Sequence, residues 1–270
     1  MTATDDITHG ECLFAIPRSM LLHPGNCSIS RVFEKDPLKS KSGWAELLIA
    51  LMYEYTNPES KWKPYFELVP NFKKLDLPMF WPKNDRDDLL RGTGVSEAVN
   101  RDLDNISTEF HDVVLPYINR HKEIQWHGTL HKELKFYKQM VAFVMAYSFT
   151  ENSQDWEEQE EGEGQTEATP PMMVPMADIL NHVAKNNTHL SFEKEFLKMV
   201  ATKDIRKGEE VYNTYGELAN WHLLHMYGFA EEYPLNHYDT VSICTCTCMS
   251  CHVLLKVQCH MTMIDASIIL

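Results

Sequence analysis

The chain has 270 residues, 44% of them hydrophobic, which is enough to bury the core of one elaborated domain or of two smaller ones. Its formal net charge of -14 opposes nucleic-acid binding, because that affinity depends on neutralising phosphates with Lys and Arg. The sequence has no long apolar run and no secretory signal at its start, so we expect a soluble intracellular protein without a membrane partner.

The first half of the chain is predicted to contain one strand followed by a helical region. Residues 9–17 end in an apolar run between Gly10 and Pro17, which indicates a strand. Apolar residues then recur at helical spacing in three stretches. These stretches are 44–55, with Ser42 as a candidate N-cap, 99–117 and 130–145.

An acidic loop is predicted at residues 151–170. The part from 151 to 165 carries acids, Gln and Gly with almost nothing apolar, so burial cannot offset the entropy lost on ordering it. No Lys or Arg lies between Lys138 and Lys185, so negative charge is concentrated there. The loop is either a solvated insertion or a surface that attracts Lys/Arg-rich substrate segments.

The second half is predicted to return to short strands and one helix. Strand-like stretches lie at 189–192, 197–201 and 210–213, with turn residues between them. A helix is predicted at 217–227, because apolar residues again follow helical spacing and Gly228 provides a stop.

Three short motifs carry the strongest functional signal. They are PMADILNH at 175–182, VYNTYG at 211–216 and MYGF at 226–229. An Asn-His pair alone is usually a polar turn, and a Tyr-Gly pair is usually a helix end. Their order and spacing together resemble a SET-domain lysine methyltransferase.

Further motifs resemble one class of that family, the Rubisco large-subunit methyltransferase-like class. They are SGW at 42–44, KWKPYF at 61–66, PMFWP at 78–82 and AYSF at 146–149. The resemblance covers 7–240. It implies an α+β SET fold, in which small β-sheets surround a threaded Asn-His segment and a helical insert occupies 36–150.

The same resemblance implies S-adenosylmethionine as methyl donor and a lysine side chain of a protein as acceptor. Asn181, His182 and Tyr147 would contact the donor. Tyr227 would lie at the reaction centre, also touching the donor, and Tyr215 would form a second wall of the lysine channel. Trp62, Ser148 and Thr150 would border the substrate peptide.

Tyrosines suit this chemistry. Methyl transfer from a sulfonium to an amine is an in-line displacement, so the protein must hold donor and acceptor collinear and deliver the amine uncharged. Phenol rings pack around the alkyl stem and the sulfonium, and desolvation among them disfavours the ammonium form. The alternatives are a core tyrosine for Tyr215 and plain packing roles for Trp62 and Tyr147.

The implied partner is a protein with a basic, lysine-containing segment, since members of the class act on transcription-related proteins in the nucleus or the cytosol. A negative chain suits a basic partner. The sequence leaves open which protein is modified, and it also leaves open methylation of histidine instead of lysine.

Both ends of the chain depart from the family pattern, so we expect a chain truncated at both ends. It begins after the family's Gly-rich turn beside the donor, and after residue 240 it enters a Cys-rich tail, 241–270, in place of a C-terminal helical domain. Alternative hypotheses are therefore a catalytically impaired fragment that binds a basic protein segment, or a zinc-dependent interaction module. The tail has soft ligands at Cys244, Cys246, Cys248 and Cys251, but their spacing differs from the family's zinc sites, so we expect no metal.

Overall fold

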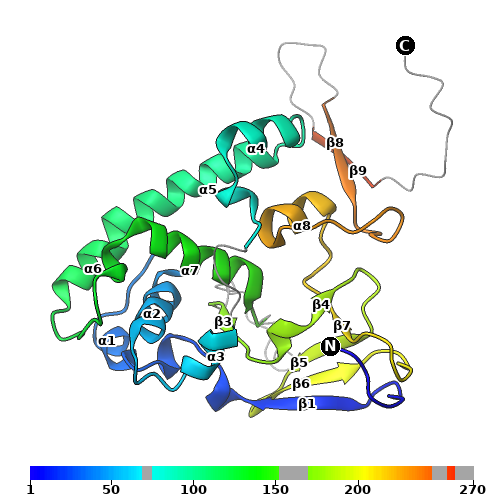
Figure 1. Cartoon of the computed structure of the whole chain (residues 1–270), viewed down its shortest axis with the longest axis horizontal. Helices are drawn as coiled ribbons and strands as arrows, with labels where there is room; N and C mark the ends of the chain where they lie inside the picture. Colours follow the sequence, from blue (N-terminus) through cyan, green and yellow to red (C-terminus); the bar gives the residue numbers. More distant parts are fainter. Residues whose placement is uncertain (69–74, 152–169, 245–253, 259–270) are drawn as a thin grey trace, which may run out of the picture.

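The computed structural model describes residues 1–68, 75–151, 170–244 and 254–258. They form a helical part and a β part, each with its own hydrophobic core. The helices α1 to α7 lie on one side of the molecule and the largest sheet lies on the other (Figure 1).

The largest sheet has three antiparallel strands in the order β1-β6-β5: β1 (Cys12–Pro17), β6 (Phe196–Ala201) and β5 (Thr188–Phe192). Alternate residues of β6 are buried, as expected for a strand with one face on a core. Leu197, Met199 and Ala201 supply that face. Predicted strands at 9–17, 189–192 and 197–201 are thereby confirmed.

Three smaller sheets have two strands each. The antiparallel pair β2 (Ser148–Phe149) and β3 (Met172–Met173) follows the helical part, and the pair β8 (Thr240–Cys244) and β9 (Leu254–Gln258) lies near the C-terminus. The parallel pair consists of β4 (Asn181–His182) and β7 (Tyr212–Asn213), which is shorter than the predicted strand at 210–213. This pairing brings two of the three sequence motifs side by side.

The helical part is built around two buried helices, α2 (Ala45–Thr56) and α7 (Leu134–Tyr147), most of whose residues belong to the core. The other helices are α1 (Ser30–Lys35), α3 (Lys63–Leu68), α4 (Lys83–Leu89), α5 (Val95–Glu109), the π-helical turn η5 (Phe110–Val114) and α6 (Leu115–Arg120). The last three form one continuous rod, and the π turn lies just before Pro116, which has no N–H to donate. The limits of 36–150 as an insert stay a prediction.

The three predicted helical stretches are confirmed, but two details differ. Ser42 is not the N-cap of α2, because the helix begins after Trp44; the Ser42 Oγ instead accepts a hydrogen bond from the Trp44 N–H at 3.0 Å. The stretch 130–145 divides into a 3₁₀ turn, η6 (Leu130–Lys132), and α7, because the backbone of Glu133 between them is extended.

The helix α8 (Asn220–Tyr227) lies between the helical part and the parallel pair β4–β7 (Figure 1). It begins later than the predicted 217, since Ala219 is extended. Gly228 ends it in the left-handed region, at φ 80°, as predicted. In the described part of the chain, no helix combines the length and the apolar character needed to cross a bilayer.

Candidate functional site

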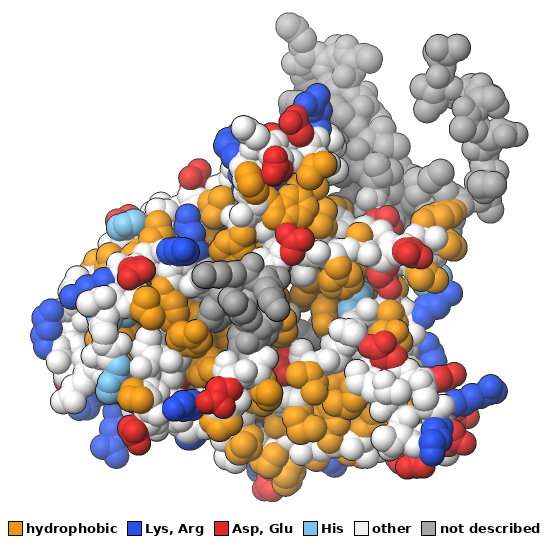
Figure 2. Space-filling view, in the orientation of Figure 1, with side chains coloured by type: hydrophobic (Ala, Val, Ile, Leu, Met, Phe, Trp, Pro, Cys, Tyr) orange, Lys and Arg blue, Asp and Glu red, His pale blue; other side chains and the backbone are white. Residues whose placement is uncertain are grey.

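A cavity of about 610 Å³ opens where the helical part meets the segment of the Asn-His motif. Its walls come from α3, α7, the end of α8 and the segments around Leu75, 175–181, Tyr215 and Phe229. They are mostly apolar and aromatic. The lining residues are Pro64, Tyr65, Leu68, Leu75, Phe143, Ala146, Tyr147, Pro175, Met176, Asp178, Ile179, Asn181, Tyr215, Tyr227 and Phe229. On this face of the molecule, hydrophobic side chains gather over the helical part and over the sheet (Figure 2).

The cavity brings together four of the residues predicted from sequence. Tyr147 ends α7, Asn181 begins β4, Tyr215 follows β7, and Tyr227 ends α8. Each comes from a different stretch of the chain. Their convergence on one hollow is the arrangement that the resemblance to the family implies.

Tyr215 and Tyr227 pack directly against each other. The ring centroids of Tyr215 and Tyr227 are 4.6 Å apart, and those of Tyr215 and His182 are 5.1 Å apart in a stacked arrangement. The Tyr215 hydroxyl donates to the backbone carbonyl of Leu180 at 2.9 Å. Burial raises the pKa of Tyr215 and of Tyr227, so both phenols keep their protons at neutral pH.

His182 faces inward, whereas its neighbour Asn181 is exposed and lines the cavity. The His182 Nδ1 accepts a hydrogen bond from the backbone N–H of Tyr215 at 3.0 Å. Burial lowers the pKa of His182, so the imidazole is neutral at physiological pH. The His182 ring therefore fixes the Tyr215 segment and does not itself line the cavity.

The Asn181 side-chain amide lies at the edge of the cavity and donates a hydrogen bond to Glu210. Its Nδ2 donates to the Glu210 Oε1 at 2.7 Å, and the N-terminal ammonium lies 3.9 Å from the same oxygen. This hydrogen bond lowers the pKa of Glu210, so the carboxylate is ionised beside the cavity. Because Glu210 holds the Asn181 Nδ2, the orientation of the whole side-chain amide, including its oxygen, is fixed.

Asp178 and Tyr65, both half-buried, form a polar pair in the cavity wall. The Tyr65 hydroxyl donates to the Asp178 Oδ2 at 2.7 Å, while the Asp178 Oδ1 is buried with no hydrogen-bond partner among the described residues. Burial raises the pKa of Asp178 to about 6, against the lowering effect of the Tyr65 hydrogen bond. An unpartnered buried carboxylate oxygen beside tyrosine rings favours a cationic ligand.

The residues predicted to border a substrate peptide are placed outside the cavity lining. Trp62 is 4% exposed in the helical core, and the Lys61 Nζ lies 5.0 Å from its ring centroid. Ser148 is half-buried in β2, and Thr150 is exposed just after it. Their roles stay predictions.

Sequence reasoning missed Tyr65, Asp178 and Phe229 as cavity residues, and it missed the carboxylate of Glu231 behind the cavity. Tyr65 and Asp178 lie inside motifs used for the resemblance, but each motif alone gives no sign that they pair over 113 positions. Phe229 is the final residue of the MYGF motif, and its ring lies 6.4 Å from that of Tyr227. A buried carboxylate such as that of Glu231 has no local sequence signal.

Within the described ranges, no group of three or more His, Cys, Asp or Glu side chains could hold a metal ion. The tail cysteines considered for zinc at 246, 248 and 251 lie outside those ranges, and so do most residues of the predicted acidic loop, 151–170. Both predictions therefore stay untested.

Comparison with known sequences gives one family. A family model described as "SET domain" matches residues 1–216. N-lysine methyltransferase setd6 of Salmo salar is 52% identical over 245 residues, which cover 90% of this chain and 53% of the relative. N-lysine methyltransferase SETD6 of Homo sapiens is 47% identical over 245 residues, covering 90% and 50%. The chain spans about half the length of these relatives.

Solved structures show the same fold. The SET domain of LSMT bound to lysine and AdoHcy matches with a TM-score of 0.67 at 20% identity, covering 90% of this chain and 52% of that one. Rubisco LSMT bound to AdoMet matches with a TM-score of 0.66 at 20% identity, covering 91% and 53%. The expected membership of the SET family and the α+β SET fold are confirmed, and both relatives above are N-lysine methyltransferases named SETD6.

Proposed function

Because the chain belongs to the SET-domain family, we propose that it transfers a methyl group from S-adenosylmethionine to a lysine side chain of a protein. The observation that carries the proposal is the convergence of Tyr147, Asn181, Tyr215 and Tyr227 on one cavity. The relatives are N-lysine methyltransferases, which supports the same reaction here.

The residues of the cavity fit a sulfonium methyl donor, which supplies the electrophilic methyl group. Asn181 offers amide hydrogen bonds at the rim, and the rings of Tyr147 and Tyr227 offer π-faces that attract a cation. The half-buried Asp178 carboxylate adds negative charge to a wall that is mostly apolar and aromatic. A neutral ligand of the same size would gain less from these groups.

The tyrosines also suit the acceptor amine. Because their pKa values are raised, Tyr215 and Tyr227 offer neutral hydroxyls that can orient an amine but cannot remove its proton at physiological pH. The surrounding aromatic wall disfavours the ammonium, so the amine loses its proton more readily on entering. Their chief contribution is therefore orientation and desolvation.

The proposed substrate is a protein with a basic, lysine-containing segment, and the proposed location is the nucleus and the cytoplasm. The negative net charge of -14 supports a basic partner, because it raises the local concentration of positively charged segments. No part of the proposal requires nucleic acid.

A methyl-transfer assay on a lysine-containing substrate tests the proposal. Tyr215→Phe and Tyr227→Phe should each lower kcat at least about tenfold, since each removes a hydroxyl that orients the amine and leaves the ring in place. Tyr53→Phe is the matched control, because Tyr53 packs its ring edge-on against Trp126 outside the cavity. It should keep the parental rate.

Three outcomes decide between the alternatives. Full activity in both cavity variants would contradict the assignment of the tyrosines. Saturable binding of the labelled donor without transfer would favour a catalytically impaired, protein-binding chain. Mass spectrometry that places the methyl group on histidine would favour the protein-histidine methyltransferase.

A further inference from the structure

A second polar pair lies behind Tyr215 and Tyr227, two of the tyrosines of the cavity wall. The His182 Nε2 and the Glu231 Oε2 face each other at 3.9 Å, and their side chains are 1% and 7% exposed. Neither atom has a hydrogen-bond partner among the described residues. A movement of about 1 Å would bring the two atoms to hydrogen-bond distance. A hydrogen bond between them would remove the cost of burying each polar atom without a partner.

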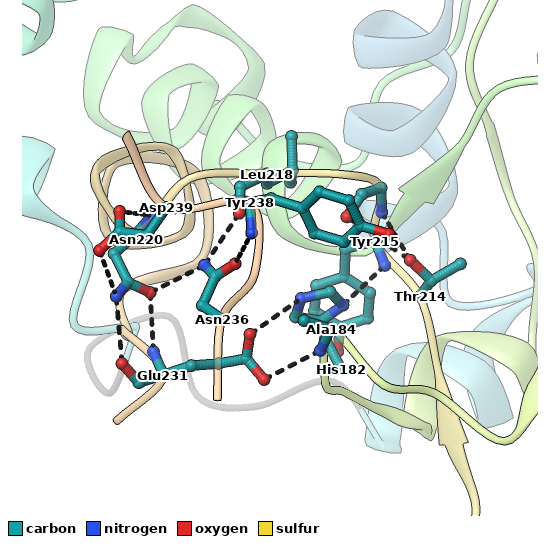
Figure 3. Close-up of polar contacts among 11 residues, drawn as sticks. His182, Ala184, Thr214, Tyr215, Leu218, Asn220, Glu231, Asn236, Tyr238 and Asp239 are labelled. Atoms are coloured by element: carbon teal, nitrogen blue, oxygen red, sulfur yellow. Dashed lines mark hydrogen bonds and ion pairs between the residues drawn. The ribbon is translucent and has the colours of Figure 1, made fainter. Parts of the chain in front are cut away.

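Glu231 also holds the backbone of the Asn-His segment. Its other oxygen, Oε1, accepts a hydrogen bond from the Ala184 N–H at 2.9 Å (Figure 3). One carboxylate therefore faces both the imidazole and the chain two residues beyond it. Each oxygen serves a different group.

The position of Glu231 is fixed by the first residue of α8. The Asn220 Oδ1 accepts from the Glu231 N–H at 3.0 Å, and the Asn220 Nδ2 donates to the Glu231 carbonyl at 3.1 Å (Figure 3). Asn220 begins the helix that ends in Tyr227. The pair of hydrogen bonds ties the carboxylate to the element that carries one wall of the cavity.

The hydrogen bonds of His182 fix its tautomer. Because Nδ1 accepts the Tyr215 N–H, the proton of the neutral ring must be on Nε2, the atom that faces Glu231. A carboxylate at that point favours this tautomer. The imidazole then links Glu231 on one side to the Tyr215 backbone on the other.

We propose that Glu231 is a positioning residue for methyl transfer, which acts through His182 to hold Tyr215 against the cavity. The inference rests on the proposed function and adds a residue that touches neither donor nor acceptor. Glu231 is needed as a carboxylate because two acceptors are required at one place. A glutamine has one amide oxygen and can accept from either Ala184 or His182, but not from both.

The charge on Glu231 also sets the pH range over which the link survives. When His182 is protonated, its Nδ1 can no longer accept the hydrogen bond from the Tyr215 N–H. Activity should therefore fall as pH drops through the lowered pKa of His182. Glu231 is the charged side chain that acts on this imidazole; Tyr215 and Phe229 pack their rings on it and bring no charge. Removing the negative charge makes the imidazolium less stable, so the pKa of His182 falls further.

Glu231→Gln tests the inference in the full chain, with Glu232→Gln as control, since Glu232 is exposed and the change in net charge is identical. Glu231→Gln should lower kcat about tenfold or more, change KM less, and move the acid limb of the pH profile to lower pH by roughly half a unit or more. Glu232→Gln should match the parent. Parental kcat and an unmoved acid limb in Glu231→Gln would overturn the inference.

A measurement on the parent chain keeps the inference testable if the variant does not fold. In protein labelled with ¹⁵N-histidine, the His182 signals, identified by their loss in His182→Asn, should report a proton on Nε2 and a pKa below 6.5. A proton on Nδ1 would overturn the inference. A parent chain that shows the expected tautomer but transfers no methyl group would overturn the proposed function, while the pairing with Glu231 would stand.

Discussion

At the scale of single residues, the wall of the cavity contains a carboxylate that is costly to keep ionised. Burial raises the pKa of Asp178 to about 6 from an ordinary value of 3.8. For a group whose folded pKa is raised, the contribution to stability is complete below the unfolded pKa and is lost as pH rises through the folded pKa. The stability contribution of the protonated Asp178 is therefore lost between about pH 4 and about pH 6. Above about pH 6 the ionised carboxylate destabilises the fold.

Asp178→Asn should remove this pH dependence. The variant keeps an acceptor for the Tyr65 hydroxyl and carries no charge. The free energy of unfolding of the variant minus that of the parent should therefore increase by up to about 3 kcal/mol from pH 4 to pH 8. Urea unfolding at both pH values measures the gain. Asp88→Asn, at an exposed position, should show no such change. A parent–variant difference that is the same at pH 4 and pH 8 would contradict the prediction.

The residues of the site differ in how far the sequence could predict them. Tyr215, Tyr227 and Asn181 lie in motifs whose order along the chain identifies a family, so the sequence alone is enough to predict them. Asp178 and Glu231 could not be predicted in this way, because their roles arise from burial and from partners on distant segments: Tyr65 for one, His182 and Asn220 for the other. Burial of a single acid leaves no periodic pattern.

At the scale of elements, α8 depends on the glycine that ends it. Gly228 has φ 80°, and a Cβ built on it would lie 2.6 Å from the backbone oxygen of Asp76. That contact is too close for real atoms, and the oxygen belongs to backbone that cannot rotate away. The helix end therefore packs on the segment that contributes Leu75 to the cavity.

Gly228→Ala should destabilise the chain more than Gly208→Ala. Both positions have positive φ, so each substitution should cost about 1 kcal/mol in backbone strain. Only Gly228 has backbone in the way, and overpacking should add about 1 to 3 kcal/mol there; Gly208 has nothing within 4 Å. Chemical denaturation of the two variants measures the difference. Equal losses would show that the close approach relaxes without cost.

The presence of each helix or strand was easier to predict from the sequence than its first and last residues. The apolar periodicity of 44–55 and 99–117 is enough to predict α2 and the rod from α5 to α6, because those faces pack on the core. The prediction of Ser42 as the cap was wrong. The Ser42 Oγ accepts from the Trp44 N–H, the Ser40 Oγ accepts from the Ala45 N–H, and the helix begins only at Ala45. The two-residue strands β4 and β7 are too short for periodicity to predict their limits.

At the scale of the whole molecule, the net charge of -14 should affect how substrates arrive. The attraction between a negative chain and a basic peptide is screened when salt rises from about 50 mM to about 500 mM, because the Debye length falls below about 10 Å. The KM for a Lys/Arg-rich peptide should therefore rise about threefold or more, while kcat stays nearly constant.

A peptide in which glutamines replace the flanking basic residues is the control, and its KM should change little with salt. Equal responses of the two peptides would contradict an electrostatic role. Replacing the acids between 151 and 165 by amides separates the two interpretations of that stretch: a smaller salt effect supports attraction of substrate, and an unchanged one supports a solvated insertion.

The parallel pair β4–β7 has a consequence for the order in which the chain folds. Its two strands are separated by the β5–β6 hairpin, whose strands are joined by three residues. Closing the hairpin first shortens the loop that the parallel pair must close, so the local event should precede the distant one. The contact between His182 and Tyr215 depends on that late step. Refolding chains should therefore regain their circular dichroism signal before they regain turnover.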